Sequence, residues 1–163
     1  MKFKVPVNEP CLIGNERKYL LKCLKDGFIS SSGFFVREFE KKFAKRLNRK
    51  FAISVSNGTA ALQLAFEALN IKKKEEVILP SFTIISCILP IIRCGAIPIL
   101  IDSDPITWNM DVKKIEDKIT SKTRAIIAPH IYGLPIDMDP LLKIAKKYKL
   151  KVIEDAAEAL GLK

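Results

Sequence analysis

The stretch RAIIAPHIYGLPIDMDPLLKIAKKYKLKVIED, residues 124–155, decides the fold of this chain. It opens and closes with short apolar runs, at residues 124–128 and 151–153, and a segment of helical period lies between them. Apolar residues in that segment recur at intervals of three and four, so they share one face of a helix. These residues are Met138, Leu141, Leu142, Ala145 and Tyr148. A strand, a helix and a second strand in this order predict a parallel βαβ unit.

Three more apolar runs precede this unit, at residues 51–55, 76–79 and 97–101. They are rich in Val and Ile, and their apolar residues are consecutive. Such runs are typical of parallel strands that helices cover on both faces. The pattern therefore predicts an α/β fold with a parallel sheet.

The beginning of the chain is organised differently. A helix is predicted over residues 16–25, and the loop GFISSSG that follows, residues 27–33, has no apolar period. We therefore divide the chain into an N-terminal helix and loop, residues 1–35, and the first part of a larger domain, residues 36–163. A second amphipathic helix is expected at the start of that domain. Its apolar face comprises Val36, Phe39, Phe43 and Leu47.

The chain of 163 residues is basic, with 28 Lys and Arg against 18 Asp and Glu and a formal net charge of +10. Most of the excess is lysine scattered over many segments, which is typical of a solvated surface. Clustered basic residues would favour binding to nucleic-acid phosphates, but the clusters here are short and no aromatic residues are interleaved with them. We expect no nucleic-acid partner, and that alternative rests on the charge alone.

Cysteine and histidine are few. The four cysteines form no C-x-x-C pair and the chain has one histidine, so neither a zinc site nor a disulfide framework is indicated. The N-terminus lacks the apolar core of a signal peptide, and no apolar run approaches the ~20 residues of a membrane span. We expect a cytoplasmic protein with reduced thiols and no membrane segment.

A turn of small residues, SVSNGTAAL at residues 54–62, joins a predicted strand to a predicted helix. Free backbone N–H groups at the positive end of a helix suit a phosphate. An ordinary capped βα turn explains the same residues, and both interpretations stay open. The sequence matches neither G-x-G-x-x-G nor the P-loop pattern, which disfavours dinucleotide and P-loop sites.

A pair of carboxylates, Glu154 and Asp155, follows the last apolar strand. Ligands of open α/β sheets bind at the carboxyl ends of strands. A buried carboxylate there needs a cationic partner, such as a protonated pyridine nitrogen. A helix N-cap aspartate is the alternative.

These elements occur in order with several short motifs, and together they carry a resemblance. The motifs are PSFT at residues 80–83, GAIP at 95–98, DSDP at 102–105 and HIYG at 130–133. The chain resembles the DegT/DnrJ/StrS aminotransferases, which act on nucleotide-linked sugars. A second group of motifs looks most like the GDP-perosamine synthase branch. That group comprises NEP at residues 8–10, GNE at 14–16, ISSSG at 29–33, and DP at 104–105 with TWN at 107–109.

The resemblance implies a fold-type-I enzyme, with three α/β/α layers around a mostly parallel sheet, that uses pyridoxal 5'-phosphate (PLP). Its reaction would transfer an amino group from glutamate to a 4-keto nucleotide sugar, as in perosamine synthesis for a surface polysaccharide such as O-antigen. The resemblance also implies a homodimer.

By motif, the resemblance places the PLP phosphate on the backbone amides of Gly58, Thr59 and Ala60. It pairs Asp155 with the pyridine N1–H, and it places Glu158 near the phenolic oxygen of the cofactor. Relatives commonly carry an aromatic residue that stacks on the cofactor ring where this chain has Ile84.

Further expectations concern a loop and two single residues. In such dimers the loop with Ser30, Ser31 and Ser32 is a candidate to contact substrate or the partner subunit. His130 is expected to pack or hydrogen-bond near the cofactor, with direct proton transfer as the alternative. Trp108 is expected to be structural.

The chain also departs from the resemblance in its length. The family's Schiff-base lysine lies a few tens of residues beyond the E-D-A-A motif, and Lys163 comes too early to be that residue. We therefore expect a fragment that lacks the catalytic lysine and the C-terminal small domain, and that is inactive alone. The alternative is an inactive relic, or a binding or regulatory module, of the same fold.

Overall fold

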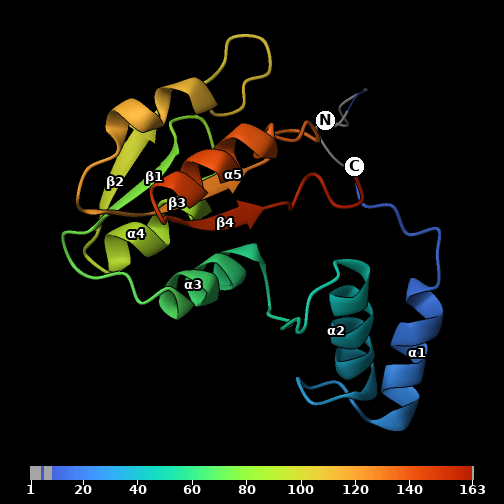
Figure 1. Cartoon of the computed structure of the whole chain (residues 1–163). Helices are drawn as coiled ribbons and strands as arrows, with labels where there is room; N and C mark the ends of the chain where they lie inside the picture. Colours follow the sequence, from blue (N-terminus) through green and yellow to red (C-terminus); the bar gives the residue numbers. More distant parts are fainter. Residues whose placement is uncertain (1–4, 6–8, 163) are drawn as a thin grey trace. The chain divides into compact units, whose positions relative to one another are not determined.

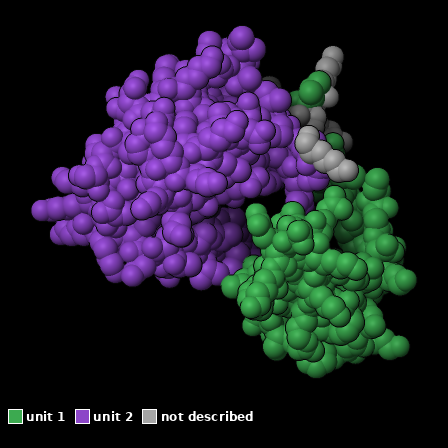
Figure 2. Space-filling model, in the orientation of Figure 1, with its two compact units in different colours: residues 1–54 green, residues 55–163 purple. Residues whose placement is uncertain are grey.

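The computed structural model describes residue 5 and residues 9–162. Two residues discussed from the sequence, Asn8 of the motif NEP and Lys163, lie outside the described residues. The chain divides into two compact units, Met1–Ser54 and Val55–Lys163, which Figure 2 colours separately. The domain limits drawn from the sequence stay a prediction.

In its described residues, the first unit contains two helices, α1 (Glu16–Asp26) and α2 (Phe34–Arg46). The helix predicted over residues 16–25 is confirmed and is one residue longer. It ends at Gly27, whose φ of 72° is a left-handed conformation that glycine adopts without steric cost.

Residues 51–55 were predicted as a strand, and this prediction is wrong. Within the described residues they pair with no other strand, and Phe51 and Ile53 are exposed. The backbone N–H and the hydroxyl of Ser54 instead donate to Glu40 Oε1, both across 2.8 Å. An apolar run becomes a strand only where a neighbouring backbone accepts and donates its hydrogen bonds.

The second unit is built on a four-stranded sheet with the order β2-β1-β3-β4, and all neighbouring strands are parallel. The strands are β1 (Glu76–Pro80), β2 (Ile97–Ile101), β3 (Thr123–Pro129) and β4 (Lys151–Asp155). The four later apolar runs of the sequence are thus confirmed as strands. Their parallel register brings the carboxyl ends of all four to one edge of the sheet.

Helices cover both faces of this sheet, so the unit has the predicted three layers (Figure 1). On one face lie α3 (Gly58–Ala68), α4 (Leu89–Arg93) and the short helix η1 (Ile85–Cys87). On the other lie α5 (Met138–Lys147) and the short helices η2 (Val112–Lys114) and η3 (Glu116–Lys118).

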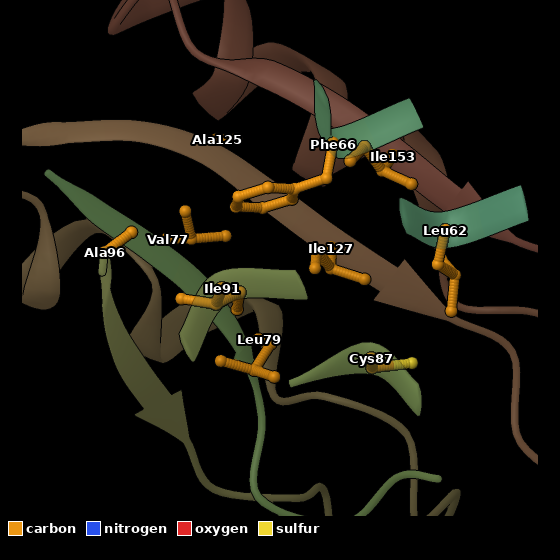
Figure 3. Close-up of a cluster of buried hydrophobic side chains, with 10 residues drawn as sticks. All are labelled: Leu62, Phe66, Val77, Leu79, Cys87, Ile91, Ala96, Ala125, Ile127 and Ile153. Carbon is orange, nitrogen blue, oxygen red and sulfur yellow. The ribbon is translucent and has the colours of Figure 1, made fainter. Parts of the chain in front are cut away.

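Alternation along the strands divides the core between the two faces. Val77 and Leu79 of β1 join the cluster under α3 and α4, where Phe66 of α3 is 2% exposed (Figure 3). Ile78, the residue between them, joins the opposite cluster with Leu141 of α5. Burying one such large side chain contributes roughly 1.5–3 kcal/mol.

The connections leave the carboxyl edge of the sheet in opposite directions. After β1 the chain turns to the face covered by η1 and α4, whereas after the neighbouring β3 it turns to the face covered by α5. A crevice opens where adjacent strands diverge in this way, and ligands of α/β sheets bind there. Among the described residues, no helix combines the length and the apolar character needed to cross a membrane.

Candidate functional site

An open pocket of about 320 Å³ lies at this crevice. Segments that follow β1, β3 and β4 line it, and its walls are mostly apolar. The lining residues are Phe82, Thr83, Ile84, Pro129, His130, Ile131, Tyr132, Asp155, Ala157 and Glu158. The topology therefore brings together side chains that are far apart in the sequence.

Asp155 is the last residue of β4 and is half-buried in this pocket. Its Oδ1 accepts from the backbone N–H of Ala157 across 3.2 Å, and its Oδ2 accepts from the thiol of Cys87 across 3.5 Å. Within the described part of the chain, no lysine, arginine or histidine forms an ion pair with Asp155. A half-buried carboxylate without a cation suits a ligand with a positively charged ring edge.

The thiol of Cys87 connects this carboxylate to the loop after β1. Thr83 Oγ1 donates to Cys87 Sγ across 3.3 Å. Burial is the main cause that raises the pKa of Cys87 to about 11, and the nearby negative charge of Asp155 adds to it. The thiol is therefore protonated at neutral pH and available as a donor to Asp155.

The small-residue turn begins α3 with Asn57 as its N-cap, whose Oδ1 accepts from Ala60 N across 2.9 Å. The cap thus occupies one of the three amides expected to hold a phosphate. The amides of Gly58 and Thr59 belong to the first helical turn, which has no intrahelical acceptor for its N–H groups. A Cβ built on Gly58 would meet no atom within 4 Å, so the space there is open to an anion.

The start of α3 is tied to the element next to the pocket. Thr59 Oγ1 and Ser86 Oγ are 2.8 Å apart. Ser86 belongs to η1 together with Cys87, the residue that contacts Asp155. The candidate phosphate position and the candidate cation position are therefore joined through η1.

Of the other candidate residues, Ile84 and Glu158 line the pocket. Ile84 is 61% exposed. Glu158 Oε2 accepts from Tyr132 N across 2.8 Å. The three serines belong to the first unit. Ser30 and Ser32 are joined by their hydroxyls at 3.3 Å.

Comparison with known proteins decides the family. Residues 10–163 match the model of the DegT/DnrJ/EryC1/StrS aminotransferase family. The chain belongs to this family. The resemblance seen in the sequence is confirmed.

A curated relative supports the resemblance to GDP-perosamine synthases. The chain is 49% identical to a GDP-perosamine synthase of Caulobacter vibrioides over 97% of its own length and 43% of that protein's. It therefore spans less than half of this curated relative.

Two solved structures share the fold. A crystal structure of an aminotransferase from Psychrobacter cryohalolentis has a TM-score of 0.87 at 36% identity, covering 93% of this chain and 39% of that one. The NtdA protein of Bacillus subtilis, solved with bound cofactor PMP, has a TM-score of 0.84 at 35% identity, covering 90% and 34%. The fold class predicted from the sequence is confirmed.

His130 of this aminotransferase-family chain is 5% exposed, and both of its ring nitrogens are engaged. Its Nδ1 accepts from Ile136 N across 3.2 Å, which leaves the proton on Nε2 to be donated to Glu154 Oε1 across 3.0 Å. These contacts favour the hydrogen-bonding role over the proton-transfer alternative.

Two residues beside the pocket were not expected to belong to a site. Asn109 is 3% exposed, and it joins two loops by donating to Leu134 O across 2.8 Å and accepting from Ile131 N across 3.1 Å. Trp108, expected to be structural, is 61% exposed. The sequence signal for both residues was their place in the motif TWN, residues 107–109.

Proposed function

We propose that this chain forms the cofactor-binding part of a PLP-dependent aminotransferase. The reaction would transfer an amino group from glutamate to a 4-keto nucleotide sugar, as in perosamine synthesis for a surface polysaccharide. The family match and the relative named GDP-perosamine synthase support this proposal. The observation that carries it is the half-buried carboxylate of Asp155, which lies in the pocket at the crevice and forms no ion pair with a described lysine, arginine or histidine.

Each candidate residue has a physical role in this proposal. PLP, when bound, supplies a protonated ring that accepts electrons from the reacting carbon. Asp155 would hold the proton on the ring nitrogen, because a carboxylate stabilises a nearby cation. Cys87 would fix the orientation of Asp155.

The remaining residues would hold the cofactor in place. The amides of Gly58 and Thr59 would bind the phosphate, and Ala60 would join them by exchanging its bond to Asn57. Ile84 would pack on the ring face. Glu158, already oriented by Tyr132 N, would lie near the phenolic oxygen.

The lysine that carries the cofactor would lie outside these 163 residues. No lysine is among the residues that line the pocket in the described chain. The 163 residues by themselves would then be inactive. We further propose a cytoplasmic homodimer in which the loop with Ser30, Ser31 and Ser32 contacts substrate or the partner subunit.

Titration of the purified chain with PLP, followed by absorbance, tests the proposal. We expect saturable binding that weakens about tenfold or more in Asp155→Ala, which is about 1.4 kcal/mol. Asp117→Ala removes an exposed carboxylate from η3 and serves as the matched control. Equal binding by Asp155→Ala and the wild type would refute the proposed role. Binding without transamination, even in the full-length protein, would favour the alternative of a binding module.

A further inference from the structure

Three aromatic side chains form a row beside the pocket. The ring centroid of Phe82 lies 5.6 Å from that of Trp108 and 6.3 Å from that of Tyr132. The three residues come from the segments that follow β1, β2 and β3, respectively. We call Trp108, Phe82 and Tyr132 the aromatic row.

The outer members of the aromatic row are largely open to solvent. Trp108 is 61% exposed and Tyr132 is 74% exposed, whereas Phe82 between them is 38% exposed. Both outer rings contact Phe82 at a steep angle, 63° and 59° between planes, so this contact does not cover their faces by stacking. Grouped and exposed aromatic rings next to a pocket are typical of ligand-binding surfaces.

The backbone holds these two rings at a steric cost. Trp108 has φ of 61° and Tyr132 has φ of 50°, and both values lie in the left-handed region that bulky residues avoid. Strain of this kind persists where the surrounding structure enforces it, and it clusters at ligand sites.

Hydrogen bonds on both sides enforce these conformations. Asp104 Oδ1 accepts from the backbone N–H of Ile106 and Thr107, just before Trp108. The buried Asn109, just after it, bonds to Ile131 N and Leu134 O. Glu158 accepts from the N–H of Tyr132 itself. The loops that carry the two rings are thus fixed to each other and to the segment after β4.

The position of the row relative to the pocket indicates what it binds. Phe82 and Tyr132 line the pocket that contains Asp155, whereas Trp108 lies beyond the lining. A nucleotide sugar carries its reacting carbonyl at one end and its planar base at the other. If the sugar lies over the cofactor at this pocket, the base can extend toward Trp108, the member of the row outside the lining.

We propose that Trp108 is the stacking platform for the base of the nucleotide-sugar substrate, and that Phe82 holds the indole in place. This inference rests on the proposed function. Base stacking on an aromatic side chain makes a binding contribution that tolerates different bases. Trp108 would therefore contribute affinity for the nucleotide part of the substrate.

The experiment uses the fact that Trp108 is the only tryptophan of the chain. Its fluorescence is followed while the purified chain is titrated with GDP and, separately, with inorganic pyrophosphate, which has no base. We expect saturable quenching by GDP at concentrations that give no quenching with pyrophosphate. Phe82→Leu keeps the reporter, and we expect it to weaken GDP binding roughly 2- to 10-fold.

Variants of Trp108 are compared by calorimetry. Trp108→Asn tolerates the left-handed backbone, and we expect GDP binding to weaken roughly 5- to 100-fold. Trp108→Phe retains a ring and should stay within about threefold of the wild type. Tyr148→Asn, which removes a partly exposed ring at the end of α5, is the matched control. Unchanged GDP affinity in both Trp108→Asn and Phe82→Leu would overturn the inference.

PLP binding, measured in parallel by its own absorbance, separates the two proposals. PLP binding without GDP binding overturns the stacking platform and leaves the proposed function in place. GDP binding that weakens in Trp108→Asn by calorimetry, without PLP binding, supports the platform while the proposed cofactor role fails. Equal binding of GDP and pyrophosphate attributes affinity to phosphate contacts and overturns the platform.

Discussion

The thiol of Cys87 donates to Asp155 Oδ2 across 3.5 Å, although the two residues are 68 positions apart in the sequence. Cys87 is fully buried under α3 and α4, and Asp155 lies at the edge of the pocket. This contact links the core of the sheet to the carboxylate that carries the proposed chemistry.

Loss of the Cys87 side chain should loosen Asp155. In Cys87→Ala the carboxylate loses a donor, and we expect PLP binding to weaken by about tenfold at most, because a thiol is a weak donor. Cys87→Ser keeps a donor and should bind PLP more tightly than Cys87→Ala. Absorbance titration of the two variants measures the difference. Equal affinities of both variants and the wild type would show that the contact does not orient Asp155.

Alkaline pH should destabilise the second unit through the same thiol. The pKa of Cys87 is raised from 9.0 to about 11 in the folded chain, mainly by burial. Between these values the unfolded chain releases the proton first, so the free energy of unfolding falls as pH rises from about 9 to about 11. Urea unfolding across this pH range measures the decrease in the free energy of unfolding, and the decrease should be smaller in Cys87→Ala. An identical pH dependence in the wild type and Cys87→Ala would show that the Cys87 thiol does not cause the decrease.

Two substitutions of Asn57, the N-cap of α3, distinguish its effect on stability from its effect on anion binding. Asn57→Ala removes the acceptor for Ala60 N and should lower the free energy of unfolding by about 1 kcal/mol. Asn57→Asp retains a good cap but adds a negative charge beside Gly58 and Thr59, so it should keep stability and weaken phosphate binding. Urea unfolding and PLP titration measure the two effects. Unchanged PLP affinity in Asn57→Asp would argue against a phosphate at this turn.

Two residues of α3 test how much burial between this helix and the sheet contributes to stability. Phe66 of α3 is 2% exposed, and Phe66→Ala should cost about 3–5 kcal/mol because it leaves a cavity among close-packed side chains. Leu64 in the same helix is 40% exposed, and Leu64→Ala is the matched control, with a cost of less than about 1 kcal/mol. Chemical denaturation of both variants should reproduce this order.

Much of the fold could be predicted from the sequence because the later strands contain consecutive apolar residues, and all four formed where they were expected. The run predicts burial on both faces, which holds for the central strands β1 and β3, whereas the edge strands β2 and β4 are only partly buried. Residues 51–55 carry the same signal but pair with no strand in the described chain. Pairing is a long-range property, and a local apolar run does not encode it.

The candidate site was predictable only in part. Asp155 could be placed at the carboxyl end of a strand, because a carboxylate after an apolar run is a local signal. Its contact with Cys87 could not, since it depends on how α4 and η1 return to the sheet. The aromatic row was missed for the same reason, as Phe82, Trp108 and Tyr132 come together only when three loops meet at one edge.

Nitrogen NMR of ring-labelled PLP bound to this chain shows whether Asp155 holds the proton on the ring nitrogen, as we propose. We predict a pyridinium chemical shift near neutral pH in the wild type and in Asp117→Ala, and a shift toward neutral pyridine in Asp155→Ala. A neutral pyridine signal in the wild type, or a pyridinium signal that persists in Asp155→Ala, would refute the proposed role of Asp155.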